Sequence, residues 1–160
     1  KGQKTSDPAV LTIQELGSIN SGLAAHFTFN KTSGTTLSDS SDNHLQANLY
    51  NFEQGTYQEG MIGGALFFDS DNDLSEVAHD EALNLSTEAT FSVWLRPVLP
   101  SGGSDFDHVI RKDINYGYVL INGDVARVHG IGKTQYSSPG EKVEAEMWQH
   151  FAYVARNGTV

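Results

Sequence analysis

A chain of 160 residues is long enough for one domain with a hydrophobic core and short for two. It carries 20 acidic and 10 basic residues, and the resulting net charge of −10 disfavours binding to phosphate backbones and anionic membrane surfaces. The absence of cysteine excludes disulfide scaffolds and thiolate metal sites, and no apolar run approaches the roughly 20 residues that span a bilayer.

The first twenty residues differ in character from the rest of the chain. Residues 1–8, KGQKTSDP, are polar and show no periodicity, and residues 9–17 hold one short apolar run that Gly17 would stop. We therefore interpret residues 1–20 as a linker or N-terminal leader and residues 21–160 as the folded domain.

From Leu23 onward, short β-prone runs alternate with turn residues, and helical spacing is almost absent. In residues 23–29 the apolar side chains lie mostly on one face, which is typical of a half-buried strand. Residues 30–44 are almost all small and polar, which predicts a long surface connection. Further strands are expected at residues 47–50, 64–68, 74–77, 89–97, 108–112, 116–121, 125–130 and 148–155.

Turn signals indicate how these strands are connected. Asn122-Gly123 separates two of the runs and suits a type I′ hairpin turn, while residues 131–142 have the composition of a flexible rim loop. Regular strands without intervening helices favour an all-β, antiparallel sandwich or jelly roll over a βαβ fold.

Four short blocks of sequence follow one another in a recognisable order. They are LAAHFTF (23–29) with the loop SGTTLSDSSDN (33–43), GGALFFD (63–69), ATFSVWLRP (89–97) and WQHFAYV (148–154). Together they resemble the laminin-G-like jelly rolls of the concanavalin A-like lectin and glucanase superfamily over roughly residues 20–160, although Asp42 stands where a glycine is usual. The resemblance implies a two-sheet antiparallel jelly-roll β-sandwich within a larger secreted or cell-surface protein. Such modules are usually non-catalytic, bind glycans or proteins, and often hold a structural calcium ion.

The resemblance also implies that strands follow the block at residues 148–154, whereas the sequence has only six residues after it. We therefore expect a jelly roll without its last strands in this chain. Its unpaired sheet edges would be filled by a second chain, a neighbouring copy or another segment.

Two acidic loops contain the residue types that calcium prefers. In the first loop, Asp39, Asp42 and Asn43 lie within five residues of one another, and the resemblance implies that Asp39 matches a calcium-ligating aspartate. The alternative is that Asp39 and Asp42 only make Asx-turns with their own backbone.

The second acidic cluster is formed by Asp69, Asp71 and Asp73. Their alternate spacing resembles the start of an EF-hand loop, but the turn glycine and the flanking helices are missing. We interpret the cluster as a solvated turn or a second cation site.

Aromatic residues in polar surroundings are the candidates for contacting a sugar. The ligand-binding candidates are Tyr50, Tyr57, Tyr116, Tyr136 and Gln135. Trp94 lies on the more polar face of its strand, but the family pattern assigns both Trp94 and Trp148 to structure.

The sequence lacks the paired carboxylates of a sandwich glycosidase, because Glu144 and Glu146 have no aspartate between them. We therefore predict no catalytic activity. The leading hypothesis is a carbohydrate-binding or adhesion module that is extracellular or on the cell surface and binds a glycan or a cell-surface protein, without nucleic acid or membrane insertion. The alternatives are a protein-interaction or spacer module without a sugar site and, third, a divergent polysaccharide-degrading enzyme.

Overall fold

Antiparallel β-strands dominate the part of the chain that the structure describes. The computed structural model describes residues 21–53, 56–69, 72–85, 88–98, 107–112, 116–122, 125–129 and 135–156. Its elements are β1 (Thr36–Ser38), β2 (Gln46–Tyr50), β3 (Tyr57–Glu59), β4 (Gly64–Leu66), β5 (Leu74–Val77), the 3₁₀ turn η1 (Glu81–Leu83), β6 (Glu88–Leu95), β7 (Asp107–Lys112), β8 (Tyr116–Asn122), β9 (Val125–His129), β10 (Gln135–Lys142) and β11 (Gln149–Arg156). The predicted all-β fold class with antiparallel sheets is confirmed.

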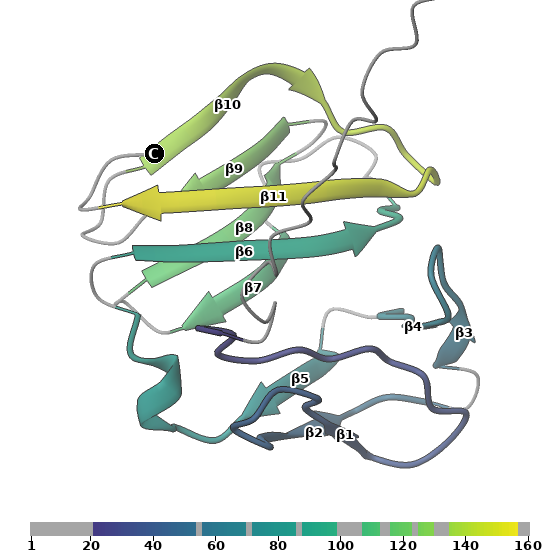
Figure 1. Ribbon diagram of the computed structural model, residues 1–160. Coiled ribbons are helices and arrows are strands. Elements are labelled where there is room, and N and C mark those ends of the chain that lie inside the picture. The colour runs from purple at the N-terminus through teal and green to yellow at the C-terminus, as the bar shows by residue number, and fades with distance from the viewer. Residues whose placement is uncertain are drawn as a thin grey trace, which may run out of the picture.

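The strands form four separate sheets. Their strand orders are β10-β9-β8-β7, β11-β6, β1-β2-β5 and the hairpin β3-β4. In Figure 1 the pair β6/β11 lies in front of the four-stranded sheet, and β1, β2 and β5 lie below both. The arrangement is therefore sandwich-like.

The β6/β11 pair is amphipathic, and its apolar face is turned toward the four-stranded sheet. Buried Val143, just after β10, contacts Leu95 of β6, Val109 of β7 and Phe151 of β11. Because side chains alternate across a strand, the neighbouring residues of β6 and β11 point away from this core. One face of the pair is thus left toward solvent, within the residues that the structure describes.

A second core lies on the β1-β2-β5 sheet. Leu37 of β1 is paired with Ala47 of β2, and both are buried together with Leu49. Phe27 and Phe29, from the segment before β1, pack against this cluster. That segment is therefore held by its apolar side chains as well as by polar contacts.

The prediction of a strand over residues 23–29 is wrong. Its faces do alternate, with Phe27 and Phe29 half-buried and Thr28 exposed, but no strand is assigned there. The backbone N–H of His26 donates to the Asp39 carboxylate instead of to a neighbouring strand, and Phe29 takes a left-handed φ of 56° that ends the extended run.

Two predicted loops contain strands. The stretch 30–44 includes β1, and the stretch 131–142 includes β10, which pairs with β9. The composition around Pro139 conceals β10, because proline cannot donate to a ladder; the register with β9 shifts between Ser137 and Lys142, across that position.

The remaining predicted strands are present within two residues of their expected ends. The predicted hairpin between β8 and β9 is confirmed by the pairing of Asn122 with Val125. Its Gly123 and the predicted linker 1–20 lie outside the described residues.

Within the described residues, β6 and β11 pair only with each other. The expectation that further strands complete this sheet stays a prediction. The described part of the chain has no helix with the length and apolar character needed to cross a bilayer.

Candidate functional site

The first acidic loop is fastened around the carboxylate of Asp39, which is only 6% exposed. Oδ1 accepts the backbone N–H groups of His26 at 2.6 Å and Ser41 at 2.8 Å. Oδ2 accepts the Ser41 hydroxyl at 2.5 Å and the Leu45 N–H at 3.2 Å. A carboxylate has about four lone-pair sites, so these four donors use the capacity of Asp39.

The charge state of Asp39 follows from the same contacts. Burial would raise the pKa of its carboxyl, but the hydrogen bonds from Ser41, His26 and Leu45 outweigh that effect and hold the pKa below its ordinary value. The Ser41 N–H bond is the i to i+2 contact of an Asx-turn. This geometry gives Asp39 a structural role at the junction of two chain segments.

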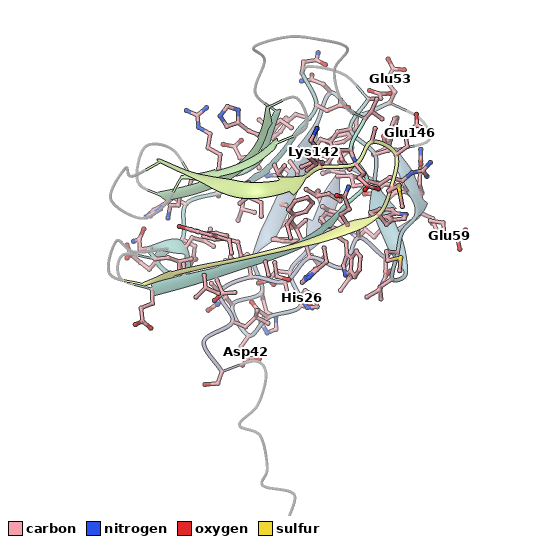
Figure 2. The ribbon with its side chains drawn as sticks, turned by 90° about the horizontal axis from the view of Figure 1, so that it is seen from above. His26, Asp42, Glu53, Glu59, Lys142 and Glu146 are labelled. Carbon is pink, nitrogen blue, oxygen red and sulfur yellow. The ribbon has the colours of Figure 1, made fainter. Side chains whose placement is uncertain are left out.

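The other two residues of the first calcium prediction behave differently. Asn43 donates its amide Nδ2–H groups to the carbonyls of Leu23 and Ala24, so it also anchors the segment before β1. Asp42 is exposed, and in Figure 2 its side chain points away from the body of the protein. The three side chains are therefore not gathered around one point.

In the second acidic cluster, two carboxyl groups lie close together. The backbone N–H of Asp69 donates to Oδ2 of Asp73 at 2.7 Å, closing a turn before β5. A hydrogen bond with the Asp73 carboxyl, together with the charges of Asp73 and Glu53, raises the pKa of Asp69. Asp71 lies outside the described residues.

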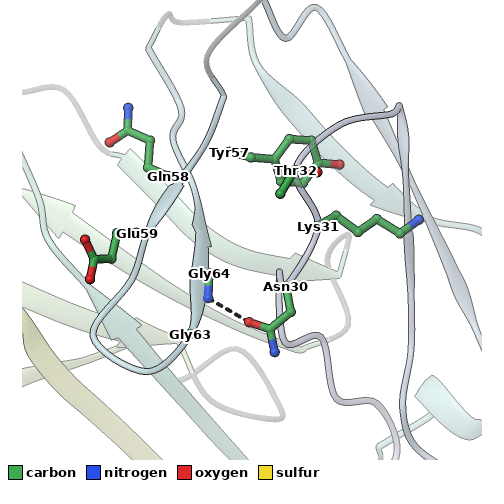
Figure 3. Close-up of a pocket in the computed structure, with 8 residues that line it drawn as sticks. All are labelled: Asn30, Lys31, Thr32, Tyr57, Gln58, Glu59, Gly63 and Gly64. Carbon is green, nitrogen blue, oxygen red and sulfur yellow. Dashed lines mark hydrogen bonds between the residues drawn. The ribbon is translucent and has the colours of Figure 1, made fainter.

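An open pocket of about 440 Å³ lies between the segment after Phe29 and the β3–β4 hairpin. We call it the Tyr57 pocket. Its lining residues are Asn30, Lys31, Thr32, Tyr57, Gln58, Glu59, Gly63 and Gly64 (Figure 3). Its volume falls within the range of small-ligand pockets.

The two walls of this pocket are joined by one side chain. Oδ1 of Asn30 accepts the N–H of Gly64 at 2.7 Å, as the dashed line in Figure 3 shows. A Cβ at Gly64 would meet the Phe29 carbonyl oxygen, and Gly63 has a φ of 70°. Glycines at both positions therefore allow the hairpin to approach the other wall closely.

The Tyr57 pocket combines an aromatic ring with polar groups that the fold does not use. Tyr57 donates its hydroxyl to the Gly34 carbonyl at 3.1 Å, which fixes the ring, and burial raises the pKa of this hydroxyl. Among the described residues, the side chains of Thr32, Gln58 and Glu59 make no hydrogen bond. They supply a hydroxyl, an amide and a carboxylate for a ligand.

Of the five sequence-predicted ligand residues, Tyr57 is the one placed in this pocket. Tyr50 is exposed at the end of β2, where it pairs with Leu74 and lies next to the second acidic cluster. Tyr116 lies in β8, and Tyr136 and Gln135 lie in β10, but their side chains are outside the described set.

Sequence reasoning missed the polar residues of the pocket. Asn30 and Thr32 belong to a stretch interpreted as surface connection, and Gln58 and Glu59 belong to a three-residue strand that has no alternating apolar pattern. The Gly63-Gly64 doublet was a usable signal, because adjacent glycines mark close backbone approach.

The assignment of Trp94 to a structural role stays a prediction. Trp94 is 38% exposed on the outward face of β6. Its ring lies against that of His150 with centroids 5.1 Å apart.

No protein family, curated protein or solved structure matches the chain. The laminin-G-like resemblance therefore stays a prediction. Within the described residues, no three His, Asp or Glu side chains are grouped in a way that could hold a metal ion.

Proposed function

We propose that this chain is a non-catalytic carbohydrate-binding module that binds a neutral glycan in the Tyr57 pocket. The observation that carries the proposal is a fixed tyrosine ring beside the Thr32 hydroxyl in a concavity whose lining also includes Gln58 and Glu59, with the side chains of these two residues on the other side of the strand in Figure 3. Sugars present an apolar ring face and paired hydroxyls, so an aromatic surface rimmed by amide and carboxylate groups matches their chemistry.

The proposal extends to the laminin-G-like jelly-roll class and to an extracellular or cell-surface setting. The all-β, sandwich-like fold and the four ordered sequence blocks support this extension. It also keeps a structural calcium ion. Because the lone pairs of Asp39 are used by N–H and O–H donors, we place this ion at the second acidic cluster, where the carboxyl groups of Asp69 and Asp73 lie close together.

The experiment is a glycan array followed by calorimetric titration of the best neutral oligosaccharide. We expect Gln58→Ala and Glu59→Gln each to weaken binding by about tenfold, since a lost hydrogen bond to a charged or amide group is worth about 1–2 kcal/mol. Gln46→Ala, a change at another exposed glutamine, on β2, is the control. Absence of binding to every glycan, or equal affinity in all three variants, would refute the proposal.

A protein-interaction module is the second candidate, and one specific observation favours it. The tip of the β3–β4 hairpin exposes Met61 and Ile62, which are 53% and 74% accessible. Exposed apolar pairs at a loop tip are common protein contacts. Loss of a captured protein partner in Met61→Ser/Ile62→Ser, with glycan binding absent, would favour this candidate.

The proposed absence of catalysis has its own test. Incubation with polysaccharides is expected to release no reducing ends. Release that follows the amount of purified protein would establish the third candidate, a divergent polysaccharide-degrading enzyme.

A further inference from the structure

The outward face of β6/β11 carries an exposed tryptophan in an ordered polar setting. The register places Trp94 opposite His150 and Ser92 opposite Ala152, so these side chains share one face. Val93 and Phe151 are paired on the opposite face, which faces the core. We call the group Ser92, Trp94, Arg96 and His150 the Trp94 face.

Two contacts fix the imidazole of His150 on this face. Its ring is tilted by 43° against the Trp94 indole, and its Nε2 lies 2.8 Å from the Ser92 hydroxyl. The indole is thus supported along one side by a ring that is itself held in place. Trp94 therefore exposes apolar surface to solvent, and the contact with His150 orients its indole ring.

Arg96 adds a held positive charge two residues after Trp94. Its Nε–H donates to the carbonyl oxygen of Glu146 at 3.0 Å. Glu146 has a left-handed φ of 59°, and its own N–H donates to the Pro97 carbonyl at 2.7 Å, so the loop before β11 is shaped around this contact. Figure 2 places Glu146 where this loop meets the strands.

The terminal amino groups of Arg96 retain their hydrogen-bonding capacity. Among the described residues, no carboxylate oxygen lies within 4.0 Å of this guanidinium, and its recorded hydrogen bond uses Nε. Guanidinium groups recognise carboxylates through paired N–H donors. Although the net charge of −10 disfavours anionic partners in general, the guanidinium of Arg96, two residues after an exposed indole, provides a local contact for an anionic group.

We propose that the Trp94 face is a second glycan site, specific for a sugar that carries a carboxylate, of the uronic acid class. The pyranose ring lies on the indole of Trp94, the carboxylate pairs with the terminal amino groups of Arg96, and His150 and Ser92 bind hydroxyls. The Tyr57 pocket would disfavour the same ligand, because Glu59 places a carboxylate in its wall and Lys31 is bonded to the Thr36 carbonyl. The two sites therefore differ in ligand charge.

The test is calorimetric titration with a galacturonic acid oligosaccharide and with its carboxyl-reduced neutral counterpart. We expect the wild-type chain to prefer the acidic ligand at low ionic strength and to lose this preference as salt increases. Arg96→Gln should weaken acidic binding by at least about tenfold, the value of one lost charge-assisted contact. Trp94→Ala should weaken it by a similar factor.

Val154→Ala, an exposed change on the same sheet face, is the matched control, and an unchanged thermal midpoint verifies that each variant is folded. Gln58→Ala in the Tyr57 pocket should leave acidic binding unaffected. Failure of the acidic oligosaccharide to bind would overturn this inference alone, while binding of a neutral glycan lost in Gln58→Ala would still support the proposed function. Acidic binding that is equal in wild type, Arg96→Gln and Trp94→Ala would also overturn it.

Discussion

The two acidic loops look alike in sequence and differ in the donors around them. Asp39 is buried, and four N–H and O–H groups converge on its carboxylate. Asp69 is exposed, and its main neighbour is another carboxyl group, that of Asp73. Consequently the pKa of Asp39 is lowered and the pKa of Asp69 is raised.

The difference teaches that acidic composition does not locate a site. A polar side chain whose hydrogen-bonding capacity is used by the fold holds the structure together, whereas one that retains capacity at a concave surface is available to a ligand. Asp39 belongs to the first kind, and Gln58 and Glu59 of the Tyr57 pocket belong to the second.

The largest expected effect is on stability at Asp39. Asp39→Asn replaces an acceptor by an NH₂ group that faces backbone N–H donors, so we expect a loss of about 3 kcal/mol in the free energy of unfolding, measured by denaturant titration. Asp42→Asn, a matched change in the same loop at an exposed side chain, should cost less than about 0.5 kcal/mol. Equal costs for the two variants would contradict the structural role of Asp39.

The pH dependence of stability should have opposite signs at the two loops. The folded-state pKa of Asp39 is lowered, so its contribution is present above the ordinary aspartate pKa of about 4 and is lost as pH falls through the folded value. The difference in unfolding free energy between wild type and Asp39→Asn should therefore shrink in acid.

For Asp69 the folded-state pKa is raised, so the folded state binds this proton more tightly than the unfolded state does. Its favourable contribution is present in acid and is lost as pH rises through the folded value. Asp69→Asn should therefore gain stability relative to wild type as pH rises toward neutrality. A gain that grows in acid instead would show that the Asp69 and Asp73 carboxyl groups do not repel each other.

Calcium gives the smallest expected effect. We expect calcium, compared with EDTA, to raise the thermal midpoint by roughly 3 °C, since a ligand that binds the folded state stabilises it. Asp73→Asn should abolish the shift and Asp42→Asn should keep it. The reverse pattern would place calcium at the first loop. An unchanged midpoint of the wild-type chain would contradict the calcium proposal.

Much of the fold was predictable because it depends on local patterns. The alternation in β6 and β11 and the turn signal at the end of β8, where a hairpin leads to β9, both lie in adjacent residues of the sequence. The error at residues 23–29 has a different origin, because the partner of the His26 N–H is the Asp39 side chain, thirteen residues away. The sequence of residues 23–29 does not show whether the His26 N–H bonds to a side chain or to a neighbouring strand.

Of the residues that line the candidate site, the sequence predicted Tyr57 and not its neighbours in the pocket. The pocket arises where the segment after Phe29 meets the β3–β4 hairpin, and Asn30 and Gly64 are thirty-four residues apart. The exposure of Trp94 could not be predicted either, because it depends on which elements cover β6, and the alternation within the strand places Trp94 only on the outward face.

The most direct test of the glycan-binding proposal is an NMR titration of the ¹⁵N-labelled chain with the neutral oligosaccharide that binds best on the array. We predict that amide shift changes concentrate at residues 30–32, 57–59 and 63–64, which form the walls of the Tyr57 pocket. Shift changes that leave these residues unperturbed, or no change at saturating ligand, would contradict the proposal.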